Sequence, residues 1–171
     1  IQALCLDKTK IILDGTAGGG GHSGEIAKYA GQLIAVDQDP DAIAVLNERL
    51  GSRDNVTIVN NNFSNIKSIL NSLGLDKIDG LLLDLGVSSY QLDNGERGFS
   101  FHQDAPLDMR MSKSGLSAKD VVNTYSEQEL ADIIFRYGEE KFSRRIAANI
   151  VKLRADKPIE TTFELVDIIK A

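Results

Sequence analysis

A glycine-rich segment, residues 14–24, carries the first pattern in this sequence that could do chemistry. It follows an apolar run and precedes an amphipathic one, and its glycines let a ligand approach the backbone and the start of the next helix closely. Gly19, Gly21 and Gly24 match the G-x-G-x-x-G pattern of nucleotide-binding loops. That pattern leaves NAD, FAD and S-adenosylmethionine open as ligands, with a turn that binds nothing as the structural alternative.

Asp14, at the entrance of this segment, distinguishes these ligands by charge. A carboxylate there repels a pyrophosphate, whereas it suits the ammonium and sulfonium charges of S-adenosylmethionine. We therefore interpret Asp14 as a cofactor-binding residue, with the capping of a helix or turn as the alternative.

Three further candidate residues stand at or just past the ends of predicted strands. Asp37 ends the run LIAVD, where a carboxylate can accept hydrogen bonds from both hydroxyls of a ribose, although a surface turn would also place it there. Phe63 follows the third strand, where it could stack on an adenine or belong to the core. Asp84 closes an all-leucine strand, and a charge at such a place is costly unless it meets water, a donor or a ligand.

Short apolar runs alternate with amphipathic helices over the first hundred residues. Strands are predicted over residues 10–14, 32–36, 55–59 and 78–85, and a helix is expected from about residue 23 to 30. Another helix begins at Pro40 with Asp39 as its N-cap, and a third ends at Gly74. The last strand is continuously apolar, as in a strand covered on both faces. This alternation predicts a doubly wound α/β fold, whose ligands bind at the carboxyl ends of the strands.

After about residue 103 the pattern changes to helices alone. Capping boxes are predicted at Ser117/Asp120, Ser126/Glu129 and Thr161/Glu164. Two apolar helix faces are expected, formed by Leu130, Ile133, Ile134 and Tyr137, and by Phe142, Ile146, Ile150 and Leu153. We therefore expect two regions: a sheet domain over residues 1–102 and a helical subdomain over residues 103–171.

The amino-acid composition limits the disulfide and metal sites, the cellular location and the partners that we expect for this chain. A single cysteine, Cys5, excludes an internal disulfide and a thiol-rich metal site, and two histidines are too few for most zinc sites, so no metal is expected. No run approaches the ~20 apolar residues of a membrane span, and no signal peptide is recognisable, which favours the cytoplasm. The net charge of -6 argues mildly against tight binding of nucleic acid. Because the chain starts with Ile1 and stops inside a helical pattern, we expect it to be a fragment.

Several longer strings occur together and in order. They are residues 15–23 (GTAGGGGHS), 36–40 (VDQDP), 63–64 (FS), 82–89 (LLDLGVSS), 91–93 (QLD), 96–101 (ERGFSF), 106–111 (PLDMRM) and 137–140 (YGEE). This ensemble resembles the RsmH/MraW family of 16S rRNA (cytosine N4)-methyltransferases, over nearly the whole chain. Members of that family are longer, so the later strands of the sheet would be absent here.

The resemblance implies a Rossmann-like class I methyltransferase sheet, incomplete in this chain, with a small helical subdomain inserted between its strands. It implies an S-adenosyl-L-methionine site made from Gly20, Gly21, His22, Asp37, Phe63, Asp84 and Gln91. It also implies that the helical subdomain helps to recognise substrate, which would be 16S rRNA or the small ribosomal subunit. The oligomeric state is left open.

The chemistry of the expected reaction points to Asp84. The N4 amine of cytosine is a poor nucleophile because its lone pair is delocalised into the ring, and a nearby hydrogen-bond acceptor would localise that pair. We take Asp84 as this acceptor and Ser88 as the second candidate. Methylation at C5 needs a cysteine nucleophile, and Cys5 precedes the first strand, so that reaction is not expected.

Basic residues supply candidate contacts to RNA phosphates. On a helix over about residues 139–154, Lys141, Arg144, Arg145 and Lys152 lie roughly opposite the apolar face, although a solvated charged face would look the same. Arg97 and Arg110 are further candidates. Two rivals remain: an NAD-type oxidoreductase, which would share the fold and Asp37, and a noncatalytic RNA-binding scaffold.

Overall fold

The structure, a computed structural model, describes all residues from Ile1 to Ala171. It divides into two compact units, which are described separately. Unit 1 comprises residues 1–86 with the short segment 111–113, and unit 2 comprises residues 87–110 and 114–171. The structure thus divides the chain near Gly86, earlier than residue 102, because the chain leaves the sheet of unit 1 soon after its last strand.

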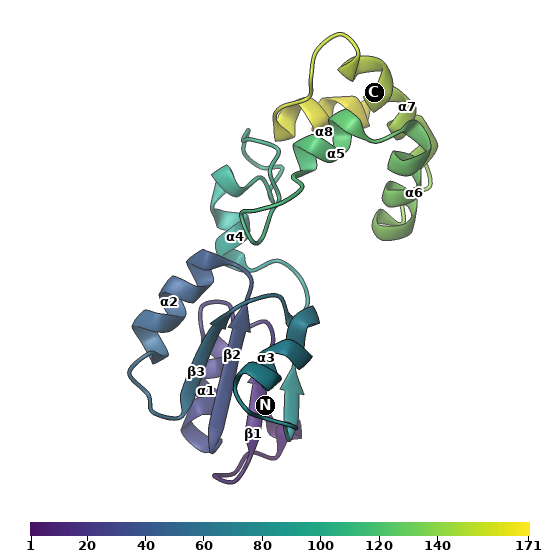
Figure 1. Ribbon diagram of the computed structural model, residues 1–171. Coiled ribbons are helices and arrows are strands. Elements are labelled where there is room, and N and C mark those ends of the chain that lie inside the picture. The colour runs from purple at the N-terminus through teal and green to yellow at the C-terminus, as the bar shows by residue number, and fades with distance from the viewer. The chain divides into compact units, whose positions relative to one another are not determined.

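Unit 1 is built on a four-stranded parallel sheet in the order β3-β2-β1-β4 (Figure 1). The strands are β1 (Ile11–Asp14), β2 (Gln32–Asp37), β3 (Val56–Asn60) and β4 (Gly80–Leu82). The helices between them are α1 (Gly21–Tyr29), α2 (Pro40–Leu50) and α3 (Ile66–Ser72), with short 3-10 turns η1 (Gln2–Leu4) and η2 (Phe63–Asn65). The predicted doubly wound α/β class is confirmed.

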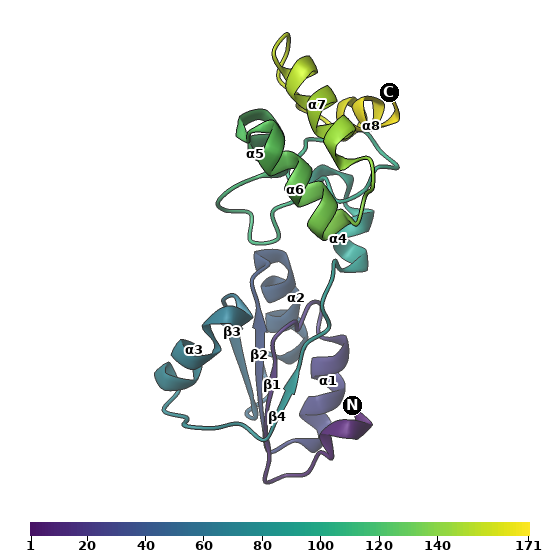
Figure 2. The same ribbon diagram turned by 90° about the vertical axis from the view of Figure 1, so that its right-hand side faces the viewer.

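Alternate residues of the central strands face opposite sides of the sheet, as the two-residue period of a strand requires. Ile12 and Leu33 pack with residues of α1 and α2, while Leu13 and Ile34 pack with Ile69 of α3. Figure 2 shows α3 on the opposite side of the sheet from α1. The helices therefore cover both faces, and the loops at the carboxyl ends of the strands are left to form a site.

The expectation that β4 is covered on both faces is wrong for this structure. β4 pairs only with β1 and forms an edge of the sheet, and Leu81 and Leu83 are 45% and 38% exposed. The strand is also shorter than predicted, because its pairing with β1 runs only from Gly80 to Leu82. The continuous apolar run therefore predicted the presence of a strand, but it did not predict which segments pack against that strand.

Unit 2 consists of helices and connecting loops. These are α4 (Ser89–Asp93), the 3-10 turn η3 (Gly95–Arg97), α5 (Ala118–Thr124), α6 (Glu127–Gly138), α7 (Ser143–Arg154) and α8 (Thr162–Lys170). All three predicted capping boxes are confirmed, at the starts of α5, α6 and α8. The core of this unit is formed by Leu107, Val122, Leu130, Ala131, Ile146, Ala147, Ile150, Ile159 and Ile168.

The ends of the two predicted apolar faces lie outside this core. Tyr137 is 84% exposed at the end of α6, Phe142 is 60% exposed just before α7, and Leu153 is 42% exposed. These three residues are therefore not part of the core, contrary to the prediction. Helical spacing indicates on which face of a helix a side chain lies, but not how far the neighbouring helix extends along that face. None of the helices combines the length and the apolar character that spanning a bilayer requires.

Candidate functional site

The glycine-rich loop connects β1 to α1 and approaches the neighbouring backbone closely. The Gly15 N–H donates to the Leu82 carbonyl at 2.9 Å, and a Cβ added at Gly15 would lie 2.6 Å from the Leu83 side chain. Gly20 is the N-cap of α1 with a φ of 86°, in the left-handed region that favours glycine. Gly21 is exposed, and a Cβ there would meet nothing within 4 Å. The start of α1 is therefore open to a ligand.

Asp14, at the end of β1, is fully buried and engaged within the loop. It accepts hydrogen bonds from the Ser23 hydroxyl at 2.7 Å and the Thr16 N–H at 3.2 Å. Burial raises the pKa of the Asp14 carboxyl above its ordinary value, while the hydrogen bonds from Ser23 and Thr16 act in the opposite direction. This geometry favours the capping alternative over direct contact with a bound ammonium.

Asp37, at the end of β2, lies beside the same loop. Its Oδ2 accepts a hydrogen bond from the Gly18 N–H and its Oδ1 one from the Asp39 N–H, both at 2.8 Å. A carboxylate offers about four acceptor positions, so two bonds from backbone leave capacity for a diol. Asp39 itself caps α2 by accepting from the Asp41 N–H, as predicted.

Asp84, two residues beyond β4, reaches the other side of the loop. Its backbone N–H donates to the Thr16 hydroxyl at 2.7 Å, and its carboxylate Oδ2 lies 3.9 Å from His22 Nδ1. The Asp84 and His22 side chains are 70% and 52% exposed. The charge at the end of the leucine-rich strand therefore meets water and a histidine, rather than a buried counter-charge.

Phe63 also lies against the loop. It begins η2 just after β3, it is half-buried, and its Cβ is 3.1 Å from the Cβ position on Gly15. Unit 1 thus brings together the predicted residues Gly20, Gly21, His22, Asp37, Phe63 and Asp84 around residues 15–22. Together they offer carboxylate acceptors, an aromatic ring and an open helix start.

Ser88 and Gln91 belong to unit 2 and cap the start of α4. The Ser88 hydroxyl accepts from the Gln91 N–H at 3.2 Å, while the Gln91 side-chain oxygen accepts from the Ser88 N–H at 3.1 Å. Gln91 is only 6% exposed. The reciprocal bonds give both residues a structural task in this unit.

The basic candidates divide into engaged and exposed groups. Arg97 is 6% exposed and donates to the Arg110 carbonyl at 3.0 Å, which favours a structural role. Arg110 forms an ion pair with Asp108 at 2.6 Å, and its hydrogen bonds hold the pKa of the Asp108 carboxyl below its usual value. The basic residues Lys141, Arg144, Arg145 and Lys152 are all exposed on or just before α7.

Two residues of the loop region escaped the sequence analysis. Thr16 contacts both Asp14 and Asp84, and Ser23 holds the buried Asp14. Their hydroxyls flank the run of glycines in the sequence, which is the signal that could have identified them. Thr16 is hydrogen-bonded to Asp84, which lies far from it along the chain, so its role depends on the folded sheet.

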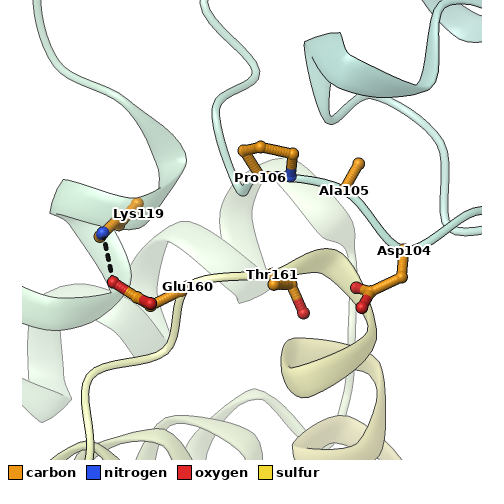
Figure 3. A pocket seen from close by; sticks show the side chains of 6 residues that line it. All are labelled: Asp104, Ala105, Pro106, Lys119, Glu160 and Thr161. Carbon is orange, nitrogen blue, oxygen red and sulfur yellow. Dashed lines mark hydrogen bonds and ion pairs between the residues drawn. The ribbon is translucent and has the colours of Figure 1, made fainter.

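Unit 2 also contains a cavity of about 420 Å³. It is lined by Asp104, Ala105, Pro106, Lys119, Glu160 and Thr161 (Figure 3). Lys119 and Glu160 are paired across it at 2.7 Å, and Pro106 forms an antiparallel bridge with Thr161. The Asp104 and Thr161 side chains accept from the backbone N–H groups of Phe163 and Glu164, and the cavity includes none of the predicted site residues.

Comparisons with known proteins agree with these features. The chain is 55% identical over 174 residues to ribosomal RNA small subunit methyltransferase H of Clostridium botulinum (strain Kyoto / Type A2), an alignment covering 99% of this chain and 56% of that protein. It is 57% identical over 176 residues to the protein of the same name from Lachnospira eligens, covering 100% of this chain and 56% of that protein. The chain therefore spans about half the length of the curated relatives it matches.

Two solved structures show weaker likeness. One is a protein from Streptococcus mutans in complex with SAH, with a TM-score of 0.36, 26% identity and 37% of each chain covered. The other is an rRNA methylase from Streptococcus thermophilus, with a TM-score of 0.43, 19% identity, and 59% of this chain and 61% of that chain covered. Both scores are too low to transfer a ligand position to this chain.

The family match covers every residue. The model of the MraW methylase family aligns with residues 1–171, which include the glycine loop, Asp37 and Asp84. Identity above one half to the relatives agrees with that match. The chain belongs to the MraW methylase family.

Proposed function

We propose that this chain forms the S-adenosylmethionine-binding part of a methyltransferase that acts on the N4 amine of a cytidine in small-subunit ribosomal RNA. The observation that carries the proposal is the position of Asp37, whose carboxylate binds Gly18 of the glycine loop and keeps acceptor capacity for a ribose. The relatives' name, ribosomal RNA small subunit methyltransferase H, supports the substrate class.

Charge at the loop favours this cofactor over a dinucleotide. Asp37 and Asp84 are hydrogen-bonded to residues 15–18 from either side: the Asp37 carboxylate accepts from the Gly18 N–H, and the Asp84 backbone N–H donates to the Thr16 hydroxyl. A pyrophosphate placed against the start of α1 would face these negative charges, whereas a sulfonium and an ammonium would be attracted. The oxidoreductase alternative is therefore disfavoured.

The reaction proposed is an in-line displacement. When bound, S-adenosylmethionine supplies an electrophilic methyl group. Asp84 accepts a hydrogen bond from the N4 amine of cytosine, localises its lone pair, and takes up the proton released when the new N–C bond forms and the C–S bond breaks. The exposed carboxylate of Asp84 can pass that proton to water. The His22 side chain, whose Nδ1 lies 3.9 Å from Asp84 Oδ2, helps to orient this carboxylate. Ser88 is the less favoured acceptor because its hydroxyl caps α4.

Unit 2 is proposed to contact the RNA, with 16S rRNA or the small ribosomal subunit in the cytoplasm as the partner. The exposed residues Lys141, Arg144, Arg145 and Lys152 offer positive charge for phosphates. Arg97 and Arg110 are weaker candidates, because they are engaged within the unit.

Calorimetric titration tests the cofactor. S-adenosylhomocysteine should bind and NADH should not. Asp37→Ala should weaken binding by at least about tenfold, since a hydrogen bond to a charged group contributes roughly 1.5–3 kcal/mol. Asp76→Ala serves as the matched control, because Asp76 is an exposed carboxylate in the loop between α3 and β4. Binding of NADH alone would contradict the proposal, and RNA binding without either ligand would favour a noncatalytic scaffold.

Transfer of a labelled methyl group to small-subunit rRNA tests the reaction. Asp84→Asn should slow turnover by about 10²–10⁴-fold, the range for loss of a positioned proton acceptor. Mass spectrometry of the digested RNA should identify N4-methylcytidine. Unchanged turnover would remove Asp84 from the role of acceptor, and a methyl group on another atom would overturn the proposed specificity.

A further inference from the structure

The glycine loop is joined to the strand tips on both of its sides. The Gly15 N–H donates to the Leu82 carbonyl at the end of β4, and the Ala17 N–H donates to the Val36 carbonyl of β2 at 3.1 Å. The residue between them, Thr16, is half-buried. The loop therefore crosses the end of β1 and connects the strands on either side of it.

Thr16 connects the loop to Asp84 through its side chain. Its Oγ1 accepts a hydrogen bond from the Asp84 backbone N–H at 2.7 Å, and its own N–H donates to the buried Asp14 carboxylate. The two residues are 68 positions apart in the sequence. The half-buried Thr16 hydroxyl thus holds the backbone of Asp84 through a short hydrogen bond, although the Asp84 side chain itself is 70% exposed.

Asp84 needs such support because the sheet no longer holds it. The pairing of β4 with β1 ends at Leu82, two residues before Asp84, and Gly86, two residues after Asp84, has a φ of 143° that other residues rarely adopt. Burial of its side chain does not fix Asp84 either. The hydrogen bond to the Thr16 hydroxyl therefore fixes the position of the Asp84 backbone, from which the Asp84 carboxylate extends.

We propose that Thr16 is a positioning residue that fixes Asp84 relative to the cofactor loop. This rests on the proposed function, because the position of Asp84 affects a rate only if Asp84 acts on the methyl acceptor. In-line transfer requires close alignment of three atoms, and a misplacement of about 1 Å can cost roughly 10²-fold in rate. Thr16 therefore contributes to turnover without contacting the RNA base.

The decisive variant is Thr16→Val, which keeps the shape of the side chain and removes the acceptor oxygen. Three quantities are measured in the protein: residue-resolved hydrogen exchange of the Asp84 amide, the dissociation constant of S-adenosylhomocysteine, and the single-turnover rate of methyl transfer. We expect exchange at Asp84 to accelerate at least tenfold and the rate to fall ten- to hundredfold, with the dissociation constant changed less than threefold.

Two further variants separate positioning from a general loss of structure. Thr16→Ser keeps the hydroxyl and should recover most of the rate lost with valine. Thr57→Val makes the same substitution on β3, where the hydroxyl forms no hydrogen bond in the structure, and should leave all three quantities near their starting values. If serine does not recover the rate, the hydroxyl is not what positions Asp84.

The outcomes also distinguish this inference from the proposed function. Rapid exchange at Asp84 in Thr16→Val with an unchanged transfer rate overturns the positioning role, as does unchanged exchange at Asp84. Loss of cofactor binding equal to the loss of rate would assign Thr16 to the binding site instead. If the unmodified protein neither binds S-adenosylhomocysteine nor transfers a methyl group, the proposed function fails, and the positioning role fails with it whatever the exchange shows.

Discussion

Asp14 at the glycine loop of unit 1 and the capping-box glutamates of unit 2 lie in opposite environments. In unit 1, Asp14 is fully buried and burial raises its pKa. In unit 2, Glu164 and Glu129 lie at helix starts, where hydrogen bonds lower their pKa values, that of Glu164 to about 2. A lowered pKa means that the folded unit stabilises the charged form, whereas a raised one means that the charge is tolerated at a cost.

The two regions also differ in how far apart their bonded groups lie along the chain. The capping boxes of unit 2 join residues three positions apart, such as Thr161 and Glu164. The bonds around the glycine loop join Gly18 to Asp37 and Thr16 to Asp84, which meet only when the sheet has formed. The helix starts of unit 2 are thus specified by local signals, and the candidate site of unit 1 by distant ones.

The largest expected effect tests whether the two cores are separate. Ile34→Ala in unit 1 and Ile150→Ala in unit 2 each remove a fully or almost fully buried side chain and should lower the free energy of unfolding by about 2–5 kcal/mol. Hydrogen exchange followed by mass spectrometry should show faster exchange mainly in the unit that carries the substitution. Equal acceleration in both units after either change would contradict the division.

A smaller effect is expected from removing the buried acceptor of unit 1. Asp14→Leu leaves the Ser23 hydroxyl and the Thr16 N–H without their acceptor, which should cost roughly 1–3 kcal/mol in chemical denaturation. Asp14→Asn keeps one acceptor oxygen and should lose less. If the leucine variant is as stable as the asparagine variant, these hydrogen bonds do not stabilise the loop.

Loss of a local cap in unit 2 should cost less again. Ser126→Ala removes the side chain that accepts from the Glu129 N–H at the start of α6, and such caps contribute about 1 kcal/mol. Thermal unfolding should record the loss. Ser52→Ala, at an exposed turn position, provides the comparison, and an equal loss there would show that the cap has no special role.

The smallest effect is a pair of opposite pH dependences. The pKa of Glu164 is lowered from 4.5 to about 2, chiefly by Lys157, so its stabilising contribution is present above pH 4.5 and is lost as the pH falls toward 2. The pKa of Asp14 is raised above 3.8, so its contribution is present below that pH and is lost as the pH rises through the folded value.

Denaturation of the unmodified protein, Glu164→Gln and Asp14→Asn between pH 2 and pH 7 measures both dependences. The stability advantage of the unmodified protein over Glu164→Gln should grow with pH, and its advantage over Asp14→Asn should shrink. Parallel trends for the two variants would remove the distinction between the Asp14 and Glu164 carboxyl groups.

Much of the local structure was predictable from the sequence. Asp39 and Pro40 mark the start of α2, and the three capping boxes begin their helices as expected, because each signal involves groups within a single helical turn. The strand–helix alternation likewise predicted the parallel sheet, since each strand carries its own apolar pattern. His22, Phe63 and Gln91 came from family resemblance, and their roles at a cofactor stay predictions.

Tertiary structure alone decided how these elements use their side chains. It left Leu81 exposed at a sheet edge, buried Arg97 within unit 2, enclosed Asp14 in the glycine loop, and brought Thr16 to the backbone of Asp84. The sequence determined where helices and strands begin and what chemistry the strand tips carry, because those depend on neighbours a few residues away. Exposure and long-range partners depend on which distant segments meet, and no local pattern encodes that.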